Sequence, residues 1–240
     1  MLVAEQVAVL DQLSEGRVIL GVGRGFRREM LEIFGVEPRQ KRQQFEACLR
    51  QMIRAWSGAD LLEDPNRESV CLAPETVQKP HPPVWVAAFG PKALKQAGSF
   101  GLPYLASPIE SLERLKQNYA RHREACVQAG HEVSGVVPVM RNIFISSNAG
   151  ELRHVRALLE EQMKEIAHSQ GGRSASLASA AAETRVENWA IVGEANAVHD
   201  KIAVYREQLG MTHLINARMR IEGVEEKLRI RSMEYLSDLN

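Results

Sequence analysis

Apolar side chains recur every three or four residues in several long segments, a spacing that places them on one face of a helix. The first stripe is Val3, Val7, Leu10 and Leu13, so the sequence begins inside a predicted helix. Similar stripes predict further helices around residues 45–56, 112–119, 152–163, 198–209 and 224–228.

Short runs of almost continuous apolar residues lie between these helices. They cover residues 18–22, 84–88, 103–106, 136–145 and 212–217. Because a half-exposed strand would alternate apolar and polar residues, these five runs predict strands that are buried on both faces. Buried strands separated by amphipathic helices are typical of an α/β fold with a parallel sheet. A doubly wound sheet and a (β/α) barrel both fit this pattern.

Two segments interrupt the alternation of helices and strands. Residues 59–81 are polar and rich in turn formers, and they predict an excursion between a helix and the next strand. Residues 170–187 are rich in Ser, Ala and Gly, which is typical of a mobile lid or of a disordered linker. No other change in composition marks a boundary, so we expect a single domain over residues 1–240.

The chain carries 30 basic and 30 acidic side chains, and this balance disfavours nucleic acid or an anionic membrane as a partner. No signal peptide and no membrane-spanning run is present in the sequence, which predicts a cytoplasmic protein. The three cysteines form no CxxC pair, so neither a disulfide framework nor a metal site is expected. His122 and Cys126 have the spacing of two metal ligands, but without a second pair an ordinary helix face is the stronger interpretation.

Glycines at positions 21, 23 and 25 directly follow the first predicted strand. A dinucleotide-binding turn needs the spacing GxGxxG and an acidic residue that closes a second strand about twenty positions later. Here the glycine spacing differs, and the later region is the predicted helix around Glu46. The alternative is a strand end that faces a phosphate, with the Arg24 guanidinium donating two parallel hydrogen bonds. On spacing alone, Arg24 fits a solvated basic surface equally well.

A second candidate for anion binding follows the strand at residues 84–88. Gly90 and Pro91 open a predicted helix there, and proline is favoured in the first helical turn. Free amides at a helix N-terminus bind anions with the help of the helix dipole. Together with Arg24, this turn predicts a phosphate clamp with two sides.

Three blocks of sequence, in this order, resemble the bacterial luciferase-like flavin-dependent monooxygenase family. The first holds LDQLSEGR, GVGRG and FGVE, the second is HPPVWVAAFGPKALKQAGSFGLPYLAS, and the third is IVGEANAVHDKIAVYREQLGMTHLI. The resemblance covers nearly the whole chain. It implies a (β/α)8 TIM barrel that binds reduced flavin, either FMN or coenzyme F420. It also implies an oxidoreductase that takes reduced flavin from a separate reductase and uses O2 to oxygenate a small organic substrate.

The resemblance also suggests roles for individual residues. Arg24 and Arg42 look like ligands of the flavin phosphate, although Arg42 fits a surface position nearly as well. Gly90 and Ala93 look like the other half of the clamp, and Phe89 would line the flavin ring. The segment 170–187 resembles the mobile lid of the family. The luciferases place a cysteine directly before the arginine of this motif, where this chain has Gly23.

The five predicted strands correspond to the last five β/α units of the family barrel, so its first three strands are expected to be missing from this sequence. The family's catalytic histidine would come from the missing part, and we therefore assign no catalytic residue. Five strands of a barrel expose two edges, which predicts pairing with another copy as a homo-oligomer. An internal start within a longer gene, an inactive remnant and a shortened barrel are three explanations.

Two other functions compete with a monooxygenase. The missing strands favour a non-catalytic flavin-binding or interaction protein. An isomerase or lyase could use the same phosphate site, but no lysine or pair of carboxylates stands out at a strand end. Lys92 lies in a helical turn, and Glu110 lies in a loop after Pro108.

Overall fold

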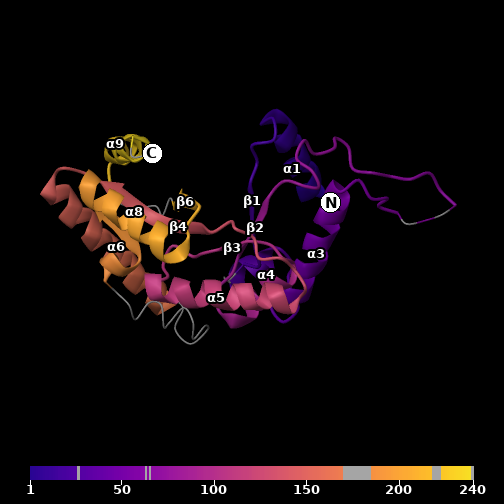
Figure 1. The fold of residues 1–240 in the computed structure, drawn as a ribbon, viewed down its shortest axis with the longest axis horizontal. Coiled ribbons are helices and arrows are strands. Elements are labelled where there is room, and N and C mark those ends of the chain that lie inside the picture. Colours follow the sequence, from indigo (N-terminus) through magenta and orange to yellow (C-terminus); the bar gives the residue numbers. More distant parts are fainter. Residues whose placement is uncertain (26–27, 63, 65, 170–184, 218–222, 239–240) are drawn as a thin grey trace. The chain divides into compact units, whose positions relative to one another are not determined.

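The computed structural model describes all of the chain except residues 26–27, 63, 65, 170–184, 218–222 and 239–240. Helices and strands alternate along the described sequence (Figure 1). The chain divides into two compact units, Met1–Ala87 and Ala88–Asn240. The single domain expected over residues 1–240 stays a prediction.

The described part of the first unit contains α1 (Leu2–Leu13), β1 (Leu20–Gly23), α2 (Arg28–Ile33), α3 (Lys41–Trp56) and β2 (Val84–Ala87). Strands β1 and β2 pair in parallel, with residues 20–23 opposite residues 84–87. Helices α1 and α3 are joined by Trp56, whose indole N–H donates to the Ala4 carbonyl at 3.0 Å. Because Trp56 is buried and its polar atom is paired, this side chain adds apolar contact without an unsatisfied group.

The LDQLSEGR motif forms the end of α1 and the turn that follows it. Asp11 is fully buried, and its carboxylate accepts hydrogen bonds from the Gln78 backbone N–H at 2.9 Å and from the Gln78 side-chain amide at 2.8 Å. The chain then turns at Gly16, whose φ of 77° favours glycine. Asp11 therefore fastens the end of the excursion over residues 59–81 to α1. As predicted, the described residues of that excursion form no helix or strand.

The described part of the second unit contains α4 (Pro91–Ser99), β3 (Tyr104–Leu105), α5 (Leu112–Gln128), β4 (Pro138–Ile145), α6 (Ala149–Ser169), the 3-10 helix η1 (Val186–Asn188), β5 (Ala190–Gly193), α8 (Ala195–Leu209), β6 (His213–Asn216) and α9 (Glu226–Ser237). Strand β4 lies in the middle of a parallel sheet. Its residues 138–141 pair with β6 and its residues 142–145 pair with β5. Ala106, next to β3, forms a parallel bridge to Val139 of β4.

Both faces of β4 are covered by buried side chains. Ile143 and Ile145 belong to a core that includes Val198 of α8. Phe144 points into a second core, which includes Leu159 of α6. This confirms the prediction that continuous apolar runs form parallel strands buried on both faces.

The five predicted strands are all present, with ends shifted by one or two residues. The count of five is wrong, because the described residues contain a sixth strand, β5. The short helix α2 was also not predicted, because no apolar stripe was identified over its residues. Whether three further barrel strands are missing from the sequence stays a prediction.

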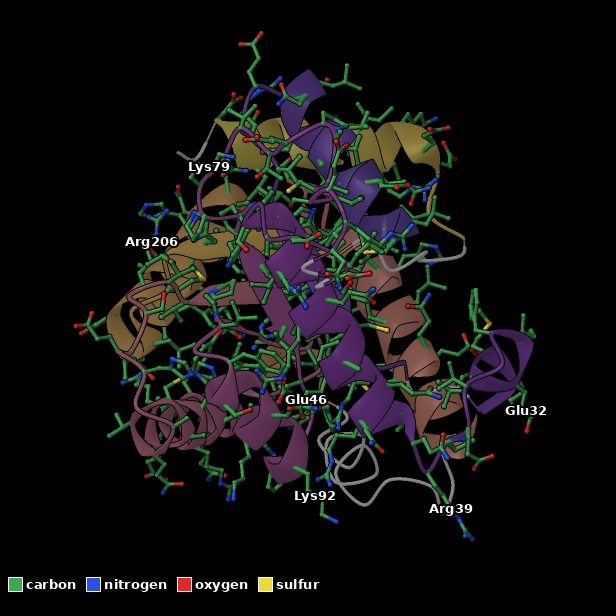
Figure 2. All side chains as sticks on the ribbon, turned by 90° about the vertical axis from the view of Figure 1, so that its right-hand side faces the viewer. Glu32, Arg39, Glu46, Lys79, Lys92 and Arg206 are labelled. Carbon is green, nitrogen blue, oxygen red and sulfur yellow. The ribbon has the colours of Figure 1, made fainter. Side chains whose placement is uncertain are left out.

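Several of the labelled charged side chains lie on the outside of helices (Figure 2). Glu32 of α2, Lys92 of α4 and Arg206 of α8 are all exposed. Among the described residues, no helix is both long enough and apolar enough to cross a bilayer.

Helices α4 and α5 approach closely at Gly98. A Cβ atom added there would lie 2.6 Å from Ala125 Cβ and 2.9 Å from the backbone of α5. Neither neighbour is the end of a flexible side chain, so the helices would have to separate. One turn away on α5, His122 contacts the Leu102 carbonyl at 2.9 Å. Part of its ring is thus used within the fold, in agreement with the interpretation of the His122 and Cys126 pair as a helix face.

We predict that Gly98→Ala lowers the free energy of unfolding by about 1–3 kcal/mol, because the added methyl group overpacks the contact between α4 and α5. Gly135→Ala is the matched control, since its added Cβ would have no atom within 4 Å. Urea unfolding followed by circular dichroism measures both variants. Equal stability of the two variants would contradict the close helix contact.

Candidate functional site

Arg24 directly follows β1 and is held by a turn at Gly25. The φ of Gly25 is 69°, a backbone conformation that disfavours residues with a side chain. Arg24 is half-buried, and among the described residues it has no hydrogen-bond or ion-pair partner. Burial lowers the pKa of its guanidinium, and the positive charge of Arg42 lowers this pKa further. Within the part of the chain that the structure describes, no carboxylate is among the causes that shift the pKa of Arg24.

Arg42 lies in the first turn of α3, and its side chain is exposed. The neighbouring Lys41 approaches the Gly25 carbonyl, with its Nζ at 3.5 Å. The first turn of α3 has no acidic residue and no side-chain cap. The structure thus brings Arg24 and Arg42 close enough for the charge of Arg42 to act on Arg24.

The second predicted half of the clamp begins α4. Gly90 precedes this helix with φ 90° and ψ 165°, and no side chain caps the helix N-terminus. Pro91 has no N–H, and the amides of Ala93 and Leu94 both donate to the Gly90 carbonyl at 3.1 Å. Among the described residues, the Lys92 amide has no acceptor. An anion at this turn would therefore find the Lys92 N–H, whereas the Ala93 N–H is already used.

Phe89 is partly buried and packs against the core that holds Ile109 and Phe144. Ala93 is 4% exposed. Phe89, Gly90 and Ala93 lie in the second unit, whereas Arg24 and Arg42 lie in the first. The clamp that the two sets would form together stays a prediction.

The predicted lid over residues 170–187 lies outside the described residues except for its last three positions. Two of these positions begin η1. Among the described residues, no group of three or more His, Cys, Asp and Glu side chains is placed to hold a metal ion.

A buried carboxylate lies behind the loop that follows β3. Glu110 is fully buried, and its Oε2 accepts hydrogen bonds from the Tyr104 hydroxyl and from the Ser107 N–H, each at 2.7 Å. Its Oε1 accepts from the Asn118 side-chain amide. Burial raises the pKa of Glu110, and these hydrogen bonds together with the charge of Arg141 oppose the rise.

Arg141 of β4 completes this cluster and is itself fully buried. Its guanidinium donates to the carbonyls of Glu110 at 2.8 Å and Ser107 at 3.1 Å. Its Nε donates to the Tyr205 hydroxyl of α8 at 3.0 Å. Arg141 thus fixes the Ser107–Glu110 loop to the sheet and to a helix. This loop follows the C-terminal end of β3. In α/β barrels, active sites form at the C-terminal ends of the strands.

This cluster was not predicted from the sequence, although Arg141 carried a signal. Arg141 interrupts an apolar run of residues that predicts a buried strand. A charge in such a strand must be paired inside the fold, which is a reason to search for a partner. The partner was not evident, because Glu110 is 31 positions away in the sequence and lies in a loop.

We predict that Glu110 makes stability depend on pH. Because its folded-state pKa is raised above the usual 4.5, the folded state binds the proton more tightly than the unfolded chain. Stability therefore falls as the pH rises from 4.5 through the raised pKa. Glu110→Gln keeps the shape of the side chain but should remove this dependence of stability on pH. Glu113→Gln on the surface of α5 is the control and should keep the dependence unchanged. Urea unfolding at several pH values measures the effect, and an unchanged slope in Glu110→Gln would overturn the assignment.

The chain is similar to known proteins, but the similarity covers only part of the length of each relative. A phthiodiolone/phenolphthiodiolone dimycocerosates ketoreductase from Mycobacterium sp. (strain JLS) is 29% identical over 155 residues, which are 60% of this chain and 39% of that protein. The chain thus spans about two fifths of this curated relative.

Solved structures show the same fold at lower sequence identity. One neighbour is the oxygenating constituent of 3,6-diketocamphane monooxygenase from Pseudomonas putida, in complex with FMN, with a TM-score of 0.71 and 18% identity over 98% of this chain and 73% of that chain. Another is the coenzyme F420-dependent tetrahydromethanopterin reductase from Methanopyrus kandleri, with a TM-score of 0.63 and 18% identity over 100% of this chain and 79% of that chain.

The fold is therefore the α/β, TIM-barrel-like fold of these proteins. The sequence model of the luciferase-like monooxygenases matches residues 1–213. This match covers the first two blocks on which the resemblance rested and all but the last two residues of the third. The chain belongs to the luciferase-like monooxygenase family.

Proposed function

We propose that the chain is a flavin-dependent monooxygenase, which uses reduced flavin and O2 to oxygenate a small organic substrate. The observation that carries the proposal is the family match over residues 1–213, together with the half-buried Arg24 at a strand end, whose pKa is lowered by burial and by the charge of Arg42. FMN is the favoured cofactor, because a structural neighbour is in complex with it. Coenzyme F420 is the alternative, since another neighbour depends on it.

The described residues fit a flavin phosphate in chemistry. Arg24 and Arg42 supply two cations, and Arg24 has no protein acceptor among the described residues. A guanidinium matches the geometry of a phosphate because it donates two parallel hydrogen bonds. The uncapped start of α4 offers the Lys92 amide, and Gly90 keeps that turn free of a side chain.

In the proposed mechanism, Arg24 and Arg42 bind the phosphate and thereby fix the position of the cofactor. Phe89 lines the ring, and the residues around it exclude water. Reduced flavin, when bound, supplies the electrons for the activation of O2 and for the transfer of one oxygen atom to the substrate. The buried Glu110 and Arg141 hold the loop after β3 in place. A separate reductase as the source of reduced flavin, the segment 170–187 as a lid and assembly as a homo-oligomer are further parts of this proposal.

A non-catalytic flavin-binding protein is the second candidate. It is favoured by the chemistry of Arg24, Arg42 and the Lys92 amide, since each of them suits the binding of a phosphate and none is assigned a role in oxygen transfer. Both candidates require flavin binding, and only the first requires oxygenation.

We predict that the chain binds reduced FMN in an anaerobic titration and that Arg24→Gln weakens this binding at least about tenfold, because a charge-assisted contact to the phosphate is lost. The control is Arg50→Gln, since Arg50 lies on the surface of α3 and pairs with Glu46. Riboflavin, which lacks the phosphate, should bind both variants equally.

The oxygen step separates the two candidate functions. Admitting O2 to the loaded protein with a panel of ketones and aldehydes should give an oxygenated product in the monooxygenase. Binding of FMN without any product would favour the flavin-binding protein. Unchanged FMN affinity in Arg24→Gln would overturn the phosphate assignment.

A further inference from the structure

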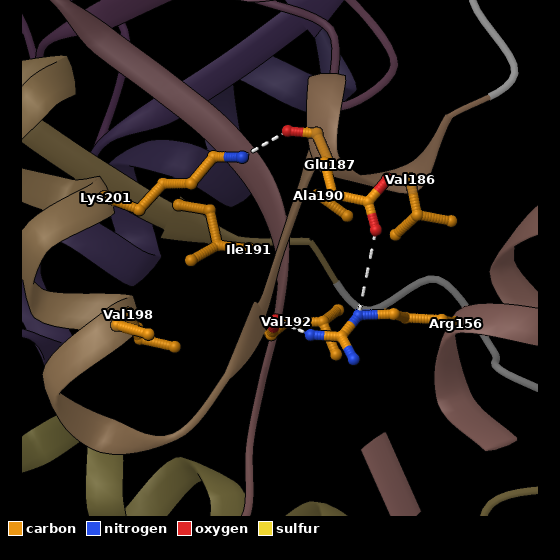
Figure 3. A pocket seen from close by; sticks show the side chains of 9 residues that line it. Arg156, Val186, Glu187, Ala190, Ile191, Val192, Val198 and Lys201 are labelled. Atoms are coloured by element: carbon orange, nitrogen blue, oxygen red, sulfur yellow. Dashed lines mark hydrogen bonds and ion pairs between the residues drawn. The ribbon is translucent and has the colours of Figure 1, made fainter. Parts of the chain in front are cut away.

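A pocket lined by two cations lies within the second unit, among α6, η1, β5 and α8 (Figure 3). The space open to the centre of a water-sized molecule is about 40 Å³. Its apolar walls include Val186, Ile191 and Val198, each at most 1% exposed. This pocket shares no residue with the proposed flavin site.

Two cations reach this pocket from two different helices. Arg156 of α6 donates from Nη2 to the Val192 carbonyl at 2.7 Å. Lys201 of α8 donates from Nζ to the Glu187 carbonyl. Both acceptors are neutral backbone groups, so these hydrogen bonds orient the cations without balancing their charges (Figure 3).

Glu187 is the acidic residue among those that line the pocket, and its one carboxylate acts on both cations. Its Oε1 lies 3.9 Å from Arg156 Nε, which is too long for a hydrogen bond. The Glu187 side chain is 62% exposed, so water screens its charge. The pocket therefore has two cations and one weakly paired carboxylate.

The pKa of Lys201 indicates that the charge of its ammonium is only partly balanced. Burial lowers the pKa of its ammonium, and the positive charge of the buried Arg141 lowers this pKa further. The carboxylate of Glu187 raises the pKa but does not cancel the effect of burial. An anion beside Lys201 would favour its charged form.

We infer that this pocket binds a small oxyanion group between Arg156 and Lys201. The guanidinium offers paired donors and the ammonium offers a point charge, the combination that suits phosphate and carboxylate oxygens. The apolar walls remove water from the contact and so strengthen it. The inference does not depend on flavin binding.

Titration of the 240-residue chain with inorganic phosphate, followed by amide NMR signals, tests this site. We expect saturable shifts at Ile191 and Val192. Arg156→Gln and Lys201→Gln should each weaken this binding about tenfold or more, because each removes a charged donor. The controls Arg153→Gln on α6 and Arg206→Gln on α8 are exposed and should bind normally.

Two further variants keep the test decisive if a pocket variant folds poorly. Glu187→Gln removes the competing negative charge and should tighten phosphate binding, so weaker binding would contradict the inference. Arg24→Gln should leave the shifts at Ile191 and Val192 unchanged, which separates this pocket from the proposed flavin site. Absence of saturable shifts at these two amides in the unmodified chain would overturn the inference.

Discussion

The fold of the second unit depends on one buried cation, Arg141. Its guanidinium meets the hydroxyl of Tyr205 and the carbonyls of Ser107, Met140 and Glu110, so its charge is distributed over the strand, a loop and a helix. A charge inside a protein costs several kcal/mol unless its hydrogen bonds are satisfied. Here that requirement imposes a geometry, because the loop after β3 and helix α8 must both approach β4.

The other cations discussed above make fewer hydrogen bonds to described residues than Arg141 does. Arg24 is half-buried without an acceptor among the described residues, and Arg156 and Lys201 each donate to one backbone carbonyl. A fully buried cation with several internal hydrogen bonds stabilises the fold, whereas a partly exposed cation with one such bond or none keeps donors for an anionic ligand. The same residue type thus supports structure at one position and binding at another. Membership of the luciferase-like monooxygenases is consistent with a phosphate as that ligand at Arg24.

The sequence predicted the parts of the fold that depend on local periodicity. Helices α1, α3, α5, α6 and α8 carry clear apolar stripes, and the strands around Val86 and Ile143 are continuous apolar runs. Strand β5 has the same four-residue length and the same glycine end as the predicted β1, so its short apolar run was a signal that remained unused. The Glu110 and Arg141 cluster was missed because it joins residues that are distant in sequence. Among the predicted site residues, Arg24 and Arg42 do influence each other, but the use of the Ala93 amide within its own turn could not be read from the sequence.

The number of internal hydrogen bonds that a cation makes decides how far it stabilises the fold. Equilibrium urea unfolding of Arg141→Met and Arg24→Gln compares the two extremes. Arg141→Met removes the guanidinium from three carbonyls and the positive charge that acts on the buried Glu110, and we expect a loss of about 3–5 kcal/mol in the free energy of unfolding. Arg24→Gln removes no internal hydrogen bond to a described residue and should leave this free energy unchanged or higher. Equal losses in the two variants, or a loss below about 1 kcal/mol in Arg141→Met, would refute this explanation.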